Sequence, residues 1–211
     1  MKTGFAKDFQ NWVSSFCKKY NYPEPADSYY LKIFERIPEG VQKLINEGIK
    51  EKIIITKDHL FTLKGIAPQK GPYNWFSRSA KKEPTPNWEY FIQVAEYVRF
   101  YPLARQKGLR IGFEEGLMDI ALFRGDCLFA CIEVKEKSKD VSRLIQGIKK
   151  YQNLHPLPKI DRGNDPLRKA KYIIKHKPEY FCILAIGSRM EFKVMYPTQK
   201  TFSLKKDLLP I

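Results

Sequence analysis

Three strand-like runs follow one another between residues 109 and 135, and they limit the possible folds of this chain more than any other feature. The runs, residues 109–113, 117–123 and 128–135, are rich in Leu, Ile and Phe and are separated by short turns. Apolar runs of this length bounded by turn residues are typical of strands. A tight turn at Arg124-Gly125-Asp126 joins the second run to the third, so we expect these two strands to pair in antiparallel fashion.

A helical pattern precedes these strands and another follows them. Apolar residues recur at helical spacing over residues 87–100, and Ser138 opens a second helix that extends to about residue 153. A short helix ending near Lys177, a buried strand over residues 180–186 and a last strand over residues 191–196 follow. The order α-β-β-β-α-β with an added strand predicts an α/β (α+β) fold, in which helices flank a central mixed sheet.

The first 65 residues have a different pattern, which is mainly helical. Apolar spacing predicts helices over residues 6–20, from residue 27 or 28 to about 38, and over residues 39–52. The runs IIIT and LFTL on either side of KDH predict a hairpin. Three short helices followed by a two-stranded ribbon are similar to a winged helix, a small DNA-binding module. The alternative is a helical subdomain that only packs on the rest of the chain.

Residues 66–86 mix Pro, Gly, Lys, Arg and aromatic residues without periodicity. This composition predicts a linker, with a basic-aromatic loop that lies on phosphates and bases as the alternative. The predicted organisation is therefore an N-terminal subdomain over residues 1–65, a linker over residues 66–86 and a second domain over residues 87–211.

The chain is strongly basic, with 38 Lys and Arg residues against 23 Asp and Glu residues and a net charge of +15. This excess favours a polyanionic partner, either nucleic acid or an anionic membrane surface. Residues 86–158 are nearly balanced in charge, whereas both flanks are basic. No apolar stretch approaches the length of about 20 residues that a membrane span needs, and the first residues lack the apolar segment of a secretory signal. We therefore expect a cytoplasmic protein that binds nucleic acid and no membrane.

Asp119, Glu133 and Lys135 are the candidate catalytic residues. Alternation along a strand points Glu133 and Lys135 to one face, and residues opposed on an antiparallel pair share a face. A plain two-residue turn at Gly125-Asp126 would turn Asp119 to the other face. We therefore expect an odd-length loop or a β-bulge, which would set Asp119 opposite Cys131 or Glu133.

These residue types suit the hydrolysis of a phosphodiester. Two converging carboxylates repel each other, and a divalent cation that prefers oxygen ligands removes this cost. Mg²⁺ is such a cation, and it keeps several waters and binds substrate phosphates. Lys135 on the same face can hold an attacking water and offset the charge that develops on a phosphate.

With these residues, the segment 87–187 resembles the PD-(D/E)xK nuclease superfamily, which has the restriction-endonuclease-like fold. Asp119 matches the aspartate of the family motif, Glu133 and Lys135 match its (D/E)xK part, and Met118 stands where the family has proline. The resemblance covers about half of the chain. It implies cleavage of DNA that depends on Mg²⁺, for which Mn²⁺ can substitute, with Asp119 and Glu133 as metal ligands.

The resemblance also implies a further catalytic glutamate on the helix before the sheet. Glu89, near the start of that helix, is the preferred candidate and Glu96 is the second, while Glu115 ahead of the sheet aspartate is a third. Gln146 on the next helix is similar to a glutamine near the metal in the RecB-like and VRR-NUC branches of the superfamily. The alternative for Gln146 is a solvated helix position.

The preferred function is a magnesium-dependent endonuclease of restriction type that hydrolyses phosphodiester bonds of double-stranded DNA. A homodimer is expected, because cutting two strands needs two sites. The N-terminal helices and the basic loop over residues 155–170 would grip the duplex through its phosphates. One alternative is a structure-selective nuclease of DNA repair, recombination or mobile elements, and another is a non-catalytic DNA-binding protein.

Overall fold

The boundary between the two structural units of this chain falls inside a helix, α4 (Trp88–Gln106). In this computed structural model, which describes residues 4–79 and 81–211, the units are Met1–Tyr101 and Pro102–Ile211. Residues 1–3 and Ala80, which fall in the predicted subdomain and linker, lie outside the described residues. The predicted boundary at residue 87 differs because the first part of α4 belongs to the N-terminal core, where Phe91 stacks on Trp75 at 4.8 Å between ring centroids.

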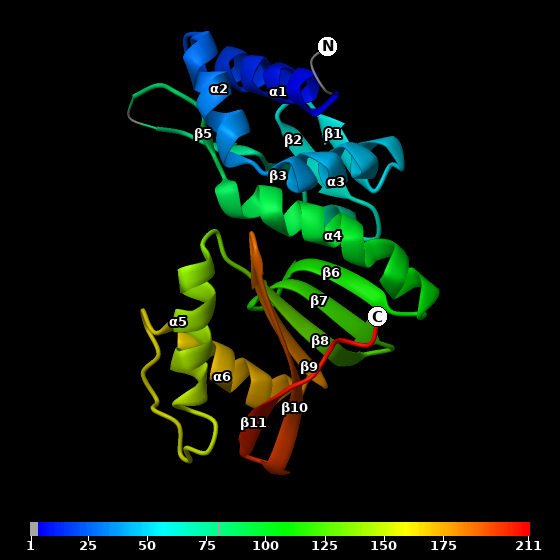
Figure 1. Ribbon diagram of the computed structural model, residues 1–211, viewed down its shortest axis with the longest axis vertical. Helices are drawn as coiled ribbons and strands as arrows, with labels where there is room; N and C mark the ends of the chain where they lie inside the picture. The colour runs from blue at the N-terminus through cyan, green and yellow to red at the C-terminus, as the bar shows by residue number, and fades with distance from the viewer. Residues whose placement is uncertain (1–3, 80) are drawn as a thin grey trace. The chain divides into compact units, whose positions relative to one another are not determined.

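The N-terminal unit begins with the elements that its apolar spacing predicts. Helices α1 (Gly4–Tyr20), α2 (Asp27–Arg36) and α3 (Glu39–Lys50) precede the antiparallel hairpin of β1 (Ile54–Lys57) and β2 (Leu60–Leu63). Their order is visible in the blue and cyan part of the ribbon (Figure 1).

The structure differs from the predicted linker over residues 66–86. This segment contains the short helix η1 (Pro68–Lys70) and the strands β3 (Tyr73–Asn74), β4 (Phe76–Ser77) and β5 (Thr85–Pro86), and β3 pairs with β2. Trp75 is fully buried and stacks on Trp12 of α1 at 4.9 Å between ring centroids. The aromatic residues of the segment therefore pack into the core of the N-terminal unit.

The C-terminal unit is a mixed α/β structure built on one six-stranded sheet. Its strands are β6 (Arg110–Glu115), β7 (Met118–Arg124), β8 (Cys127–Val134), β9 (Tyr180–Ala185), β10 (Ser188–Thr198) and β11 (Thr201–Lys206). They lie in the order β11-β10-β9-β8-β7-β6, and all neighbours are antiparallel except β8 and β9. The parallel pair needs a crossover, which contains α5 (Ser138–Lys149) and α6 (Asp165–His176). The predicted mixed sheet with helices around it is confirmed, and β11 is a strand beyond the prediction.

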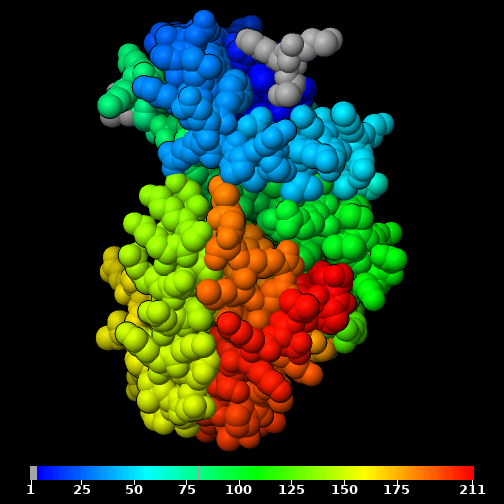
Figure 2. Space-filling view, viewed as in Figure 1, coloured from blue at the N-terminus to red at the C-terminus, as the bar shows by residue number. Residues whose placement is uncertain are grey.

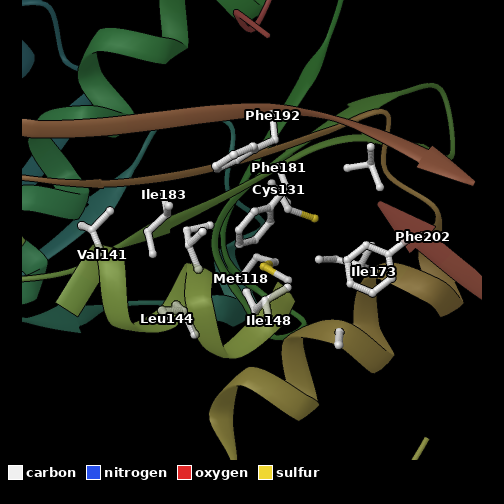
Figure 3. Close-up of a cluster of buried hydrophobic side chains, with 14 of the residues drawn as sticks. Met118, Cys131, Val141, Leu144, Ile148, Ile173, Phe181, Ile183, Phe192 and Phe202 are labelled. Atoms are coloured by element: carbon white, nitrogen blue, oxygen red, sulfur yellow. The ribbon is translucent and has the colours of Figure 1, made fainter. Parts of the chain in front are cut away.

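Helices α5 and α6 cover one face of this sheet and enclose an apolar core. On α5, buried residues recur at helical spacing, and α6 contributes a second apolar stripe. Figure 3 shows their side chains meeting those of the strands, with Val141, Leu144 and Ile148 facing Cys131, Phe181 and Ile183. At the surface of this unit, α5 lies beside β10 (Figure 2). Among the helices within residues 4–79 and 81–211, none has the length and hydropathy that crossing a bilayer requires.

Candidate active site

A β-bulge in β8 brings the two candidate carboxylates to the same face of the sheet. The turn at Gly125-Asp126 has two residues, because Arg124 pairs with Cys127. The register then shifts by one residue, so that Ile120 pairs with Ile132. Continued by one residue beyond this pair, the same register places Asp119 opposite Glu133. The bulge that the sequence analysis requires is therefore present, and a hydrogen bond of 2.6 Å from the backbone N–H of Val134 to Asp119 Oδ2 fixes the arrangement.

Glu133 is a buried carboxylate that is held by two ammonium groups. Its side chain is 3% exposed. Lys135 Nζ donates to Glu133 Oε1 at 2.7 Å, and Lys169 Nζ donates to Glu133 Oε2 at 2.5 Å. A buried carboxylate is stable only when it is paired and hydrogen-bonded, and here both oxygens have a partner. Lys135 also continues the pairing of β8 with β9, since its backbone N–H donates to the carbonyl of Leu184.

Lys169, on α6, is the member of this group that the sequence analysis missed. Its side chain is 7% exposed, and its ammonium also donates to the backbone carbonyl of Leu117 in the turn between β6 and β7. The start of α6 is fixed by Asn164, whose side chain accepts a hydrogen bond from the N–H of Leu167. A signal was present in the sequence, because Lys169 lies four residues before the buried Ile173, on the apolar stripe of α6.

The surroundings of Asp119 disfavour the charged form of its carboxyl group. Burial and the nearby charge of Glu133 raise the pKa of Asp119 to about 8, although the Val134 hydrogen bond and the two lysines act in the opposite direction. Without a further cation, the charged form of Asp119 is therefore disfavoured beside Glu133.

Two of the remaining predicted residues, Glu115 and Gln146, do not join this group. Glu115 is engaged by Arg110, whose Nη1 and Nη2 lie 3.0 Å and 3.3 Å from its carboxylate oxygens. Gln146 lies on the exposed side of α5, away from the residues that pack on the sheet. Glu89 and Glu96 belong to the N-terminal unit, where Glu89 is exposed and Glu96 pairs with Arg99 at 3.4 Å. Their roles, and that of Gln146, stay predictions.

The donor set fits a hard divalent cation with few protein ligands. In the part of the chain that the structure describes, no three His, Cys, Asp or Glu side chains gather into a metal-binding group. Mg²⁺ is commonly bound by one or two carboxylates together with waters and substrate phosphates. Asp119 and Glu133 meet this requirement, because each carboxylate oxygen has two lone pairs and the lysines use only part of this capacity.

The turn between β6 and β7, which precedes Asp119, depends on Gly116. Gly116 has φ +70°, and a Cβ added there would lie 2.6 Å from Tyr172 Oη. We expect Gly116→Ala to lower the free energy of unfolding by about 2 kcal/mol, through backbone strain and this clash. Gly125→Ala is the control, because Gly125 has φ +57° with open space around it, and we expect a loss of about 1 kcal/mol. Urea unfolding measures both, and equal losses would contradict the packing of Tyr172 on this turn.

The arrangement as a whole combines two carboxylates and two ammonium groups on the α5–α6 face of the sheet. One ammonium, Lys135, is 19% exposed and can reach a substrate, whereas Lys169 is enclosed. Such a set can bind a cation and stabilise negative charge on an oxyanion. Comparison of the chain with protein-family models, curated proteins and solved structures finds no match.

Proposed function

We propose that this protein is a magnesium-dependent endonuclease that hydrolyses phosphodiester bonds of double-stranded DNA, with the restriction-endonuclease-like fold in its C-terminal unit. The observation that carries the proposal is the group formed by Asp119, Glu133 and Lys135. The β8 bulge sets the carboxylates opposite each other, and Lys135 Nζ lies 2.7 Å from Glu133. The order of elements along the chain supports the resemblance, because β6, β7 and β8 are followed by α5, α6 and β9.

Each residue has a role that its surroundings support. Asp119 and Glu133 would hold Mg²⁺, which supplies Lewis-acid polarisation of the scissile phosphate and a more acidic water. Lys135 is the ammonium closest to solvent, so it can orient a water or a phosphate oxygen and offset the charge that develops there. The pKa of Asp119, raised to about 8, means that the proton and the cation compete for this carboxylate.

The charge of the chain supports nucleic acid as the substrate. A net charge of +15 favours binding to phosphates in a manner that weakens with salt. The N-terminal unit, with three helices followed by a hairpin, is the proposed winged-helix-like contact with the duplex. A homodimer is proposed because cleavage of both strands needs two sites.

A plasmid digest tests the proposal directly. We expect supercoiled plasmid to be nicked and then linearised in the presence of Mg²⁺ or Mn²⁺, and to stay intact in EDTA. Discrete fragments would identify a restriction-type enzyme. Cleavage restricted to flaps, junctions or ends in a panel of branched substrates would identify the structure-selective alternative. DNA binding that is unaffected by EDTA, without cleavage under either metal, would contradict the proposal and favour a non-catalytic DNA-binding protein.

A further inference from the structure

Lys169 connects the two strands that carry the proposed metal ligands. Its ammonium donates to Glu133 Oε2 at 2.5 Å and also to the carbonyl of Leu117, two residues before Asp119. It therefore ties the carboxylate of β8 to the turn that begins β7. The lysine reaches this position from α6, an element outside the motif that suggested the site.

Because Lys169 is buried, its positive charge as well as its hydrogen bonds affects the site. A buried ammonium is costly unless a carboxylate balances it. With Asp119 and Glu133 ionised, Lys135 and Lys169 bring the formal charge of the group to zero before any cation arrives. A divalent cation at the two carboxylates must then bind close to a fixed positive charge, which lowers its affinity.

We infer that Lys169 is a positioning residue that orients Glu133 for cation binding. By balancing the charge of Glu133, Lys169 also keeps the affinity for a divalent cation low until the substrate phosphate adds negative charge. This inference rests on the proposed function. The proposed function does not include this role, in which α6, through Lys169, controls when the cation binds. A phosphodiester brings a negative charge to the site, so cation and DNA assist each other's binding.

Binding of Mn²⁺ in the absence of DNA, followed by electron paramagnetic resonance, tests the inference on the full chain. We expect Lys169→Met to bind Mn²⁺ at least about tenfold more tightly than the wild type, because a repelling charge is removed. Lys171→Met on the same helix is the matched control. Lys171 pairs with Asp161 at 2.8 Å rather than with the site, and its replacement should leave the affinity within about twofold of the wild type.

The cleavage rate separates positioning from affinity. We expect Lys169→Met to cleave plasmid at least about tenfold more slowly than the wild type despite tighter Mn²⁺ binding, because Glu133 is no longer held in place. If Lys169→Met does not fold, as judged by circular dichroism, Lys169→Gln removes the charge while keeping a hydrogen-bond donor, and the same tighter binding is expected.

Two results would overturn the inference, and they differ in what else they remove. A folded Lys169 variant that binds Mn²⁺ as weakly as the wild type, or more weakly, while the wild type cleaves DNA, removes the role of Lys169 alone. A wild type that neither cleaves DNA nor loses Mn²⁺ binding on Asp119→Asn removes the proposed function and this inference together.

Discussion

Replacement of Asp119 by asparagine is expected to abolish DNA cleavage while making the protein more stable. The amide oxygen of asparagine can still accept the hydrogen bond from Val134, which is 2.6 Å long in the wild type, so the local geometry is kept. The variant loses one of the two carboxylates that would hold the cation. We expect the rate of plasmid cleavage to fall by at least about 1000-fold.

The gain in stability follows from the sign of the Asp119 shift. The pKa of Asp119 is about 8 in the folded protein, against 3.8 for an unperturbed aspartate. The folded state therefore holds this proton more tightly than the unfolded state, and wild-type stability falls as the pH rises through this interval. Asparagine carries no such cost. The advantage of Asp119→Asn should grow by at least about 2 kcal/mol between pH 5 and pH 9.

Urea unfolding in EDTA at the two pH values, together with a plasmid digest, measures both effects. Asp126→Asn is the matched control, since Asp126 lies in the exposed turn between β7 and β8. It should change neither the cleavage rate nor the pH dependence. An Asp119→Asn protein that cleaves DNA normally would exclude Asp119 from the reaction. A stability difference that stays constant with pH would show that Asp119 ionises freely.

The second large effect is expected for Lys135→Met. Lys135 is the ammonium of the site that is partly open to solvent, and it contacts Glu133 Oε1 at 2.7 Å. Its loss removes a positive charge from the place where charge develops on the phosphate, so we expect a fall in kcat of at least about 100-fold. Stability should change little, because Lys169 still pairs with Glu133.

Lys139→Met is the control for Lys135→Met, because Lys139 lies on the exposed surface at the start of α5. Single-turnover cleavage of a duplex separates the chemical step from binding. We expect DNA affinity to stay within about threefold of the wild type for both variants, since a single phosphate contact contributes modestly to binding. An unchanged rate for Lys135→Met, or a loss that only reflects weaker DNA binding, would contradict the role proposed for Lys135.

Local patterns were sufficient to predict most elements and the shared face of Asp119 and Glu133. Helical spacing located α1 and α3, and alternation along β8 showed that Asp119 could face Glu133 only if an extra residue interrupted the hairpin. The structure has this extra residue in a bulge, where the register of β7 and β8 shifts between Leu122 and Phe123. These inferences succeed because strand alternation and helical periodicity depend on neighbouring residues alone.

Features that depend on distant residues were out of reach of such patterns. The sequence pattern predicts that Trp75 belongs to a linker, whereas in the structure it stacks on Trp12 in the core of the N-terminal unit. Composition does not show which aromatic residues pack against each other. Lys169 is 36 residues from Glu133 along the chain. The sequence places Lys169 on a buried stripe of α6 but cannot say which strand that stripe covers. The contact between Lys169 and Glu133 forms because α6, in the crossover between β8 and β9, packs on the sheet. The spacing of residues along one element does not determine this packing.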